Sequence, residues 1–315
     1  MPGSSAYNSE AGGIWNLRDA ERFVRGGTWP TTRPALLDIV TGAAAAYSLR
    51  NLFANATTAV IRVRRSSDNA ESDFSGNEVL NGTLATWVGS GNNGFVRTWY
   101  DQSGNARHVG QSSASLQPTI VSSGAVVLLN GLPAIDWPSA TADKVMTGTI
   151  TTTNAATTLA VFAAVRRAGG YMKIYNIGTE TLTNGYALAP ILGNSEQDWT
   201  DTNALFLTNG YSSARTAKVI SSNSPVTSSA TTQRMLFAAV SLSVAQMFVN
   251  KTEVTYAKQN TGNASALTNA TLYLGNNDGS VQQYIGRMQE VIIWTADKSA
   301  NRTTAENEVA AYYGI

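Results

Sequence analysis

The feature of this 315-residue sequence that most constrains its fold is a succession of short strand-like runs from residue 59 onward. In AVIRVRRSS (residues 59–67), side chains alternate with a period of two, the pattern of a half-buried β-strand. Gly, Asn, Ser and Pro separate the later runs, which are GFVRTWYDQSG, PTIVSSGAVVLLNG, LAVFAAVRR, YMKIYNIG, GYALAPILG, MLFAAVSLSVAQMFVN, ATLYLGN and GRMQEVIIWTA. Many strands at short intervals argue against β-α-β units and predict an all-β fold, an antiparallel sandwich or jelly roll.

Two segments are predicted to include a helix. PALLDIVTGAAAAYSLRNLF (residues 34–53) is apolar enough for one short helix and a strand that enters the core. The ending KSANRTTAENEVAAYYGI (residues 298–315) predicts a longer helix, which Thr303 or Thr304 can cap. Helical spacing along this segment is shared by Glu306, Val309, Ala310 and Tyr313.

Residues 1–35 differ in pattern from residues 36–315, which hold the predicted sandwich domain. Within GGIWNLRDAERFVRGGTWP (residues 12–30), a short helix is predicted between two glycine pairs. So small a segment cannot bury two tryptophans by itself, so they must dock on the main domain or on another chain. We therefore expect an N-terminal docking adaptor whose contacts come from Trp15, Leu17, Phe23 and Trp29.

Charge and composition narrow the range of partners. Charged residues make up 14% of the chain, below the roughly 25% usual in soluble proteins, and the formal net charge is +1. Binding to a nucleic-acid backbone therefore has little electrostatic support. The chain has no cysteine and a single histidine, which excludes disulfides, a thiol nucleophile and metal sites built on these residues. We expect no cofactor and no metal.

No targeting or membrane segment is predicted. The start, MPGSSAYNSE, has neither the basic nor the apolar region of a secretory signal, so we expect synthesis in the cytoplasm. The longest small-apolar run, GAAAAY (residues 42–47), is too short to span a bilayer, so we expect no membrane insertion.

Three motif-like stretches have structural interpretations. GSGNNG (residues 89–94) matches a dinucleotide-binding glycine pattern by chance, because a predicted strand follows where a helix is required. His108 has no G-x-S-x-G sequence to accompany it, which favours a turn-exposed or capping role over a catalytic triad. RVRRSSDNAESDF (residues 62–74) forms either a calcium or glycan site or a strand and a loop of mutually paired charges. The EF-hand spacing fails at Ala70 and Ser72, which favours paired charges.

Hydrolysis of a glycoside would need two carboxylates that face one sugar, roughly 5 to 10 Å apart. Four carboxylates lie at or near predicted strand ends and could be brought together: Asp101, Glu180, Asp278 and Glu290. The sequence does not show that any pair meets.

Several pieces of the chain together resemble a known family. AAYSLRNL, IRVRRSSDNAESDF, TWYDQSGNARHVGQ, QPTIV and the closing YIGRMQEVIIW…AENEVAAYYGI are similar to the concanavalin-like β-sandwich in the catalytic domain of α-L-arabinofuranosidase B enzymes. The same sandwich occurs in laminin-G-like and lectin-like modules. The most specific element is YDQSGNARH (residues 100–108), where that family has a similar Tyr-Asp-Gln-Ser-Gly turn. We interpret Asp101, Gln102 and Ser103 as a turn that the fold itself uses, because Asp and Ser side chains bond nearby backbone amides.

The resemblance implies only half of a hydrolase site. The family's acid/base aspartate lies in a Gly-Gly-Asp-Asn-like turn, so in LGNNDGS (residues 274–280) Asp278 is the position that would inherit the role. The family's nucleophilic glutamate lies in a cysteine-bearing region, which has no counterpart in this cysteine-free chain. We therefore expect binding rather than catalysis.

The N-terminal segment GGIWNLRDAERFVRGGTWP resembles short segments near the ends of tailed-bacteriophage virion proteins, notably tail fibres. The hypothesis is a virion protein that contacts other virion proteins through its N-terminus and binds host-surface glycans, as a homotrimer by analogy. Aromatic rings stack on sugar C–H surfaces, and the candidates are Trp99, Tyr100, Trp199, Tyr211 and Trp294. The alternatives are a capsid decoration protein and a glycan-cleaving hydrolase of arabinofuranosidase type.

Overall fold

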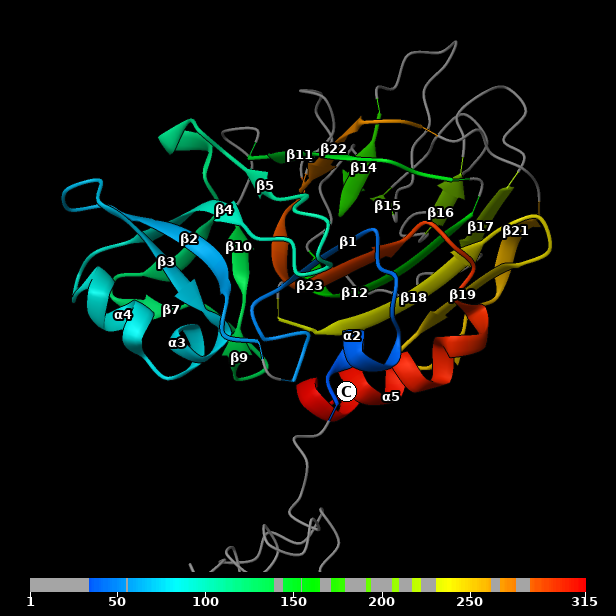
Figure 1. Cartoon of the computed structure of the whole chain (residues 1–315), viewed down its shortest axis with the longest axis horizontal. Helices are drawn as coiled ribbons and strands as arrows, with labels where there is room; N and C mark the ends of the chain where they lie inside the picture. Colours follow the sequence, from blue (N-terminus) through cyan, green and yellow to red (C-terminus); the bar gives the residue numbers. More distant parts are fainter. Residues whose placement is uncertain are drawn as a thin grey trace, which may run out of the picture.

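The computed structural model describes residues 34–54, 56–138, 144–153, 155–164, 171–178, 191–193, 206–209, 217–221, 231–261, 267–275 and 284–315. Within these ranges the chain is mostly antiparallel β-sheet with a C-terminal helix, so the predicted all-β sandwich is confirmed (Figure 1). The predicted adaptor residues Trp15, Leu17, Phe23 and Trp29 lie outside the described residues. The adaptor and its boundary at residue 35 therefore stay predictions.

Sixteen of the described strands form one continuous sheet. They are β1 (Ala45–Ser48), β2 (Ala59–Arg65), β3 (Glu71–Ser75), β4 (Gly94–Trp99), β5 (Val109–Gly110), β6 (Thr119–Ser122), β7 (Ala125–Val126), β10 (Ile135–Trp137), β11 (Met146–Ile150), β12 (Ala156–Ala164), β14 (Tyr175–Ile177), β18 (Arg234–Val240), β19 (Ala245–Val249), β20 (Thr252–Glu253), β22 (Ala270–Leu274) and β23 (Gly286–Trp294). The hydrogen-bonded order is β14-β22-β11-β5-β4-β6-β10-β23-β12-β18-β19-β20. Off this path, β1 pairs with β23, β2 with β3 and β4, and β7 with β6.

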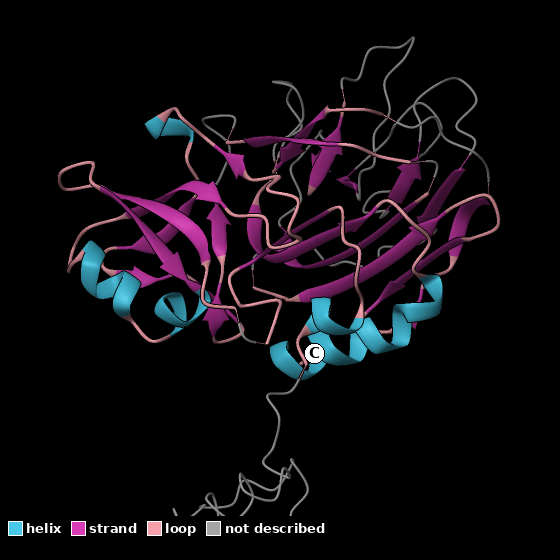
Figure 2. Cartoon of the chain, viewed as in Figure 1, coloured by secondary structure: helices cyan, strands magenta, loops and turns pink. Residues whose placement is uncertain are grey.

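Smaller sheets and helices complete the described part. The remaining strands are β8 (Leu128–Leu129) with β9 (Leu132–Pro133), β13 (Tyr171–Lys173) with β15 (Ile191–Gly193), and β16 (Phe206–Asn209) with β17 (Ala217–Ser221) and β21 (Tyr256–Asn260). The helices are α2 (Leu36–Ile39), α3 (Gly76–Leu80), α4 (Thr83–Val88) and α5 (Arg302–Tyr313), with 3-10 turns η1 (Ala114–Leu116) and η2 (Ser299–Asn301). Figure 2 shows the helices on the outside of the strands, α2 and α5 in one group and α3 and α4 in another.

The central strands are covered on both faces. All nine residues of β12 are buried. Ala160 and Phe162 contribute to the main core inside the sandwich, and Leu159 and Val161 contribute to a second core beneath α2 and α5. Because helices cover the second face, side chains on both faces of β12 are buried. The sequence of β12 is therefore a continuous, mostly apolar run instead of an alternating one. This helix layer brings residues from both ends of the described chain together.

The C-terminal helix confirms its predicted face and corrects its predicted start. Glu306, Val309, Ala310 and Tyr313 are all buried. The cap is wrong, however: α5 begins at Arg302 after the turn η2, so Thr303 and Thr304 lie inside its first turn and Asn301 holds the N-cap position. No described side chain caps this helix, and Asn301 itself has helical backbone angles.

The two other interpreted stretches are confirmed as structural. GSGNNG (residues 89–94) links the end of α4 to β4, with no helix after it. RVRRSSDNAESDF (residues 62–74) forms the β2–β3 hairpin. Its charges pair with one another, because Arg62 contacts Asp73 at 2.7 Å and Arg65 contacts Asp68 at 2.7 Å. None of the described helices is long and apolar enough to cross a membrane.

Candidate functional site

The YDQSG turn that follows β4 is built around the carboxylate of Asp101, which is 8% exposed. Its oxygens accept hydrogen bonds from the backbone N–H groups of Ala46 at 2.8 Å, Ser103 at 2.9 Å and Arg107 at 3.0 Å. The Ser103 hydroxyl donates a fourth bond at 2.8 Å. The carboxylate therefore fixes its own turn and ties it to β1, which confirms the interpretation of this stretch as architecture.

Gln102 strengthens the same junction from the opposite side. Its Oε1 accepts from the backbone N–H of Leu52 at 2.9 Å, and its Nε2 donates to the carbonyls of Ser48 at 3.1 Å and Arg50 at 3.0 Å. One buried amide side chain thus satisfies three backbone groups of the segment that leaves β1. This holds residues 48–52 in place beside the sheet.

The aromatic ligand candidates divide into three groups. Trp99 and Trp294 are fully buried, and a ring with no exposed face cannot stack on a sugar, so their assignment as ligand residues is wrong. Each packs in the core instead, Trp99 inside the sandwich and Trp294 beneath the helices. Trp199 and Tyr211 lie outside the described residues. Tyr100 alone reaches the surface among the described candidates.

Tyr100 forms part of a shallow hollow of about 310 Å³ beside the YDQSG turn. Its hydroxyl donates to Asp73 at 2.8 Å, and its ring meets the ring of His108 edge-on at 5.0 Å. Burial and this bond to Asp73 raise the pKa of Tyr100 to about 12. Asp101 and Gln102 also line the hollow, but their polar atoms are occupied by the backbone bonds described above. The hollow therefore offers a ligand few free groups.

His108 has the turn role that the sequence favours. It is exposed, and its Nδ1 accepts from the backbone N–H of Asp101 at 3.1 Å. Neither described carboxylate of the candidate hydrolase set is free for chemistry, since Asp101 is committed to its turn and Glu290 is fully buried in an ion pair. Glu180 and Asp278 lie outside the described residues. The described part therefore offers no pair of unoccupied carboxylates from this set.

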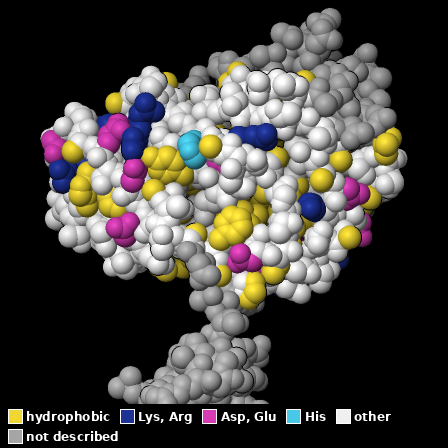
Figure 3. Space-filling model, in the orientation of Figure 1, with side chains coloured by type: hydrophobic (Ala, Val, Ile, Leu, Met, Phe, Trp, Pro, Cys, Tyr) yellow, Lys and Arg dark blue, Asp and Glu magenta, His cyan; other side chains and the backbone are white. Residues whose placement is uncertain are grey.

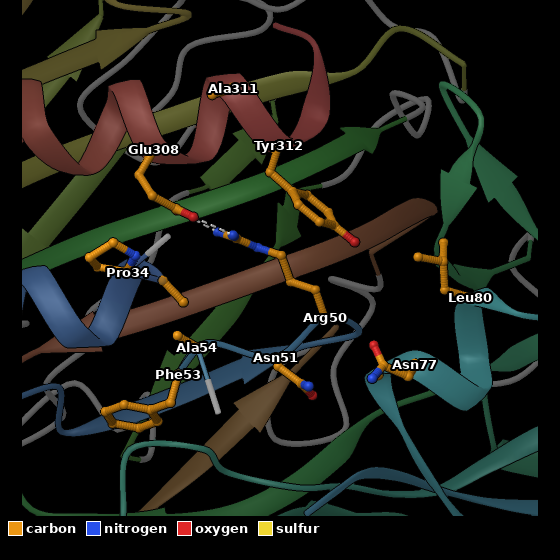
Figure 4. A pocket seen from close by; sticks show the side chains of 12 residues that line it. Pro34, Arg50, Asn51, Phe53, Ala54, Asn77, Leu80, Glu308, Ala311 and Tyr312 are labelled. Atoms are coloured by element: carbon orange, nitrogen blue, oxygen red, sulfur yellow. Dashed lines mark hydrogen bonds and ion pairs between the residues drawn. The ribbon is translucent and has the colours of Figure 1, made fainter. Parts of the chain in front are cut away.

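A larger hollow, of about 390 Å³, lies where the chain after β1 passes between α3 and α5 (Figure 4). Its apolar lining includes Phe53, Leu80 and Tyr312, which are 37%, 53% and 36% exposed. These are three of the six large hydrophobic side chains that the described part of the chain exposes. Polar groups beside them come from Asn77 and Glu308. Exposed rings grouped with amide and carboxylate side chains are the composition of a ligand site.

One wall of this hollow is a buried ion-pair network centred on Arg50. The Arg50 guanidinium bonds Glu290 through Nε at 2.8 Å and Glu308 through Nη1 at 2.6 Å and Nη2 at 2.7 Å. Its Cζ lies 4.5 Å from the centre of the Tyr312 ring. In Figure 4, Glu308 and Tyr312 point from α5 toward Arg50, while Asn77 and Leu80 come from the opposite side.

The electrostatics of the wall follow from this geometry. Burial acts to lower the pKa of Arg50, but Glu290 and Glu308 outweigh it and hold that pKa well above its ordinary value. Burial raises the pKa of Tyr312, and the neighbouring Arg50 only partly offsets this. At neutral pH the Arg50 guanidinium is therefore charged and the Tyr312 phenol neutral, and the wall sets two carboxyl side chains against one guanidinium.

The sequence signal for this hollow is weak. Its residues come from positions 50–54, 76–80 and 308–312, which no local pattern connects. The one available hint is that Tyr312 is a large aromatic residue outside the predicted buried face of the C-terminal helix. Across the described residues, no cluster of three or more His, Asp or Glu side chains could hold a metal ion.

No protein-family model matches the sequence. No curated protein matches it. Among solved structures, an arabinofuranosidase complexed with arabinofuranosyl-α-1,2-xylobiose aligns with a TM-score of 0.56 at 15% identity, over 88% of this chain and 64% of that one. A GH54 α-L-arabinofuranosidase soaked with a cyclic sulfate inhibitor aligns with a TM-score of 0.55 at 17% identity, over 88% and 65%.

This chain thus spans slightly less than two thirds of the length of these two enzymes. At such low identity the likeness shows the fold alone, a β-sandwich similar to that of arabinofuranosidase. That part of the expected resemblance is confirmed.

Proposed function

We propose that this protein recognises glycans through the hollow between α3 and α5. The observation that carries the proposal is the grouping of Phe53, Leu80 and Tyr312, all exposed, beside Asn77 and Glu308. Aromatic rings cover the C–H faces of a sugar, while amide and carboxylate groups bond its hydroxyls. The fold supports the proposal, since both aligned enzymes are named as arabinofuranosidases and one is complexed with a glycan.

The surface around the hollow suits an uncharged, polar ligand. Charged residues are only 14% of the chain, and Figure 3 shows that on this face they gather mainly at the left end, with few elsewhere. A single shallow site binds a sugar weakly. Several copies on one particle would multiply weak contacts into a strong attachment.

The experiment is a binding array of bacterial surface polysaccharides probed with the full chain. Phe53→Ala should reduce binding about tenfold because it removes one wall of the hollow. Leu242→Ala is the matched control, since Leu242 is 57% exposed on the β18–β19 turn and does not line the hollow. If neither the parent chain nor the control binds any glycan, the proposal is overturned. If the parent, the control and Phe53→Ala all bind equally, the site lies elsewhere.

The biological setting that we propose is attachment of a tailed bacteriophage to its host, with residues 1–35 docking the protein on other virion proteins. The support is the resemblance of GGIWNLRDAERFVRGGTWP (residues 12–30) to virion segments. Antibody-gold labelling of particles tests this setting. Gold on the tail supports a receptor-binding fibre, gold on the head supports a capsid decoration protein, and no gold on any particle rejects the virion setting.

A hydrolase is the second candidate, favoured by the fold likeness to arabinofuranosidases. It would place the acid/base role on Asp278, which lies outside the described residues. Release of reducing sugar from an arabinose-containing polysaccharide, abolished by Asp278→Asn with binding retained, would support it. No release by the parent chain would leave glycan binding as the function.

A further inference from the structure

The ion-pair wall of the hollow between α3 and α5 indicates which glycans it takes. Among the described residues that line this hollow, Arg50 is the only one with a cationic side chain. Four of its five N–H groups are directed at Glu290 and Glu308. Three of these bonds are described above, and in the fourth Nη2 donates to Glu290 Oε1 at 3.2 Å. An arginine so fully paired has no fork left with which to bind a carboxylate or phosphate of a ligand.

The charge that remains at the hollow is negative. Two carboxylates face one guanidinium, and Glu308 keeps 10% of its side chain exposed at the wall. The Asp38 carboxylate accepts from the backbone N–H groups of Ala35 and Ala54, both of which line the hollow, so a further negative charge lies next to lining residues. An anionic ligand would therefore meet the like charge of Glu308, and no described lining residue offers a free cation to offset it.

We infer that the hollow takes uncharged sugar residues and rejects acidic ones, such as uronic and sialic acids. This inference rests on the proposed glycan-binding function of the same hollow and names its ligand class. The exposed rings of Phe53 and Tyr312 suit it, because apolar faces bind the C–H surface of a neutral pyranose or furanose without needing charge. The exposed amide of Asn77 would bond the hydroxyl groups that neutral sugars supply.

The test compares neutral probes with acidic counterparts. The array carries lactose beside sialyllactose, and methyl-esterified oligogalacturonide beside the free acid, together with neutral and acidic bacterial polysaccharides. We expect each neutral probe that binds to exceed its acidic counterpart at least tenfold at low salt. The ratio should shrink as ionic strength rises, because salt screens the repulsion.

A variant that removes one charge tests whether the ion-pair wall causes the selectivity for neutral sugars. Glu308→Gln keeps an acceptor for Arg50 but removes the excess negative charge, so the neutral-to-acidic ratio should fall at least threefold. Asp68→Asn, which removes the same charge from the exposed β2–β3 turn, should leave the ratio unchanged. A thermal melt establishes that both variants are folded.

The outcomes separate the two proposals. If acidic probes bind as well as neutral ones, or better, the inference is overturned while glycan binding stands. The inference is also overturned, with glycan binding retained, if Glu308→Gln and Asp68→Asn both give the same neutral-to-acidic binding ratio as the parent. If no probe of either kind binds, the glycan-binding function fails, and this inference with it.

Discussion

Arg50 and Glu290, 240 positions apart in the sequence, form an ion pair with 2.8 Å between Nε and Oε2. The antiparallel pairing of β1 with β23 sets Ser48 opposite Glu290, and Arg50 follows two residues later. Both side chains are buried, and Glu290 also accepts from Ser48 and Tyr313. The pair therefore joins the first strand, the last strand and the C-terminal helix beneath one surface.

Breaking this pair should be costly. Arg50→Met leaves the Glu290 carboxylate buried without its counter-charge, so we expect the free energy of unfolding to fall by about 3–5 kcal/mol. Arg62→Met is the matched control, because the Arg62–Asp73 pair is about 40% exposed on both sides and should contribute under about 1 kcal/mol. Urea unfolding measures both. Losses of similar size in the two variants would show that the network does not stabilise the fold.

The turn after β4 gives a second prediction. Asp101→Ala removes the acceptor of three backbone N–H groups, and each buried donor left unpaired costs about 1 kcal/mol or more. We expect a loss of about 3 kcal/mol in the free energy of unfolding. Asp68→Ala removes the acceptor of the Ala70 backbone N–H and of the Arg65 ion pair at an exposed turn, and it should cost much less because water replaces exposed partners. Chemical denaturation distinguishes them, and a loss at Asp101 no larger than at Asp68 contradicts the prediction.

A pH-dependent contribution to stability is expected at Glu306. Burial raises the pKa of this carboxyl, and the charge of Arg302 only partly offsets burial. A folded-state pKa above the unfolded value means that protonation favours the folded chain. The parent should therefore gain stability relative to Glu306→Gln as the pH falls from 7 through the raised pKa toward 4.5. Thermal melts of both proteins over this range test it, and a difference that stays constant or shrinks contradicts it.

Much of the fold was predictable because its signals are local. Strand β2 shows in its alternation, and α5 in the spacing of Glu306, Val309 and Tyr313, whereas β3 formed where the sequence predicted a loop. The role of Asp101 was readable too, since an Asp before Ser-Gly bonds the backbone of its own turn. Its bond to Ala46 was not, because that contact depends on how β1 and β4 approach in space.

The candidate site was less predictable for the same reason. Trp99 and Trp294 were reasonable ligand residues by type, but the face on which a strand residue lies depends on what covers the sheet. In β23 the helix layer buries the second face as well, so Trp294 has no surface. The hollow beside Arg50 joins three distant segments, and only the packed structure brings Phe53 and Tyr312 to the same hollow.

Two substitutions of Tyr312 distinguish its ring from its hydroxyl group as the part that recognises the ligand. Tyr312→Phe keeps the ring that faces the hollow and the contact over Arg50, so glycan affinity should stay within about twofold of the parent value. Tyr312→Ala removes the stacking face, and we expect about a tenfold loss, equivalent to about 1.4 kcal/mol. Titration of the strongest array glycan measures both variants, with thermal melts to confirm folding. If Tyr312→Phe loses as much as Tyr312→Ala, the hydroxyl rather than the ring recognises the ligand, and stacking is the wrong account of this site.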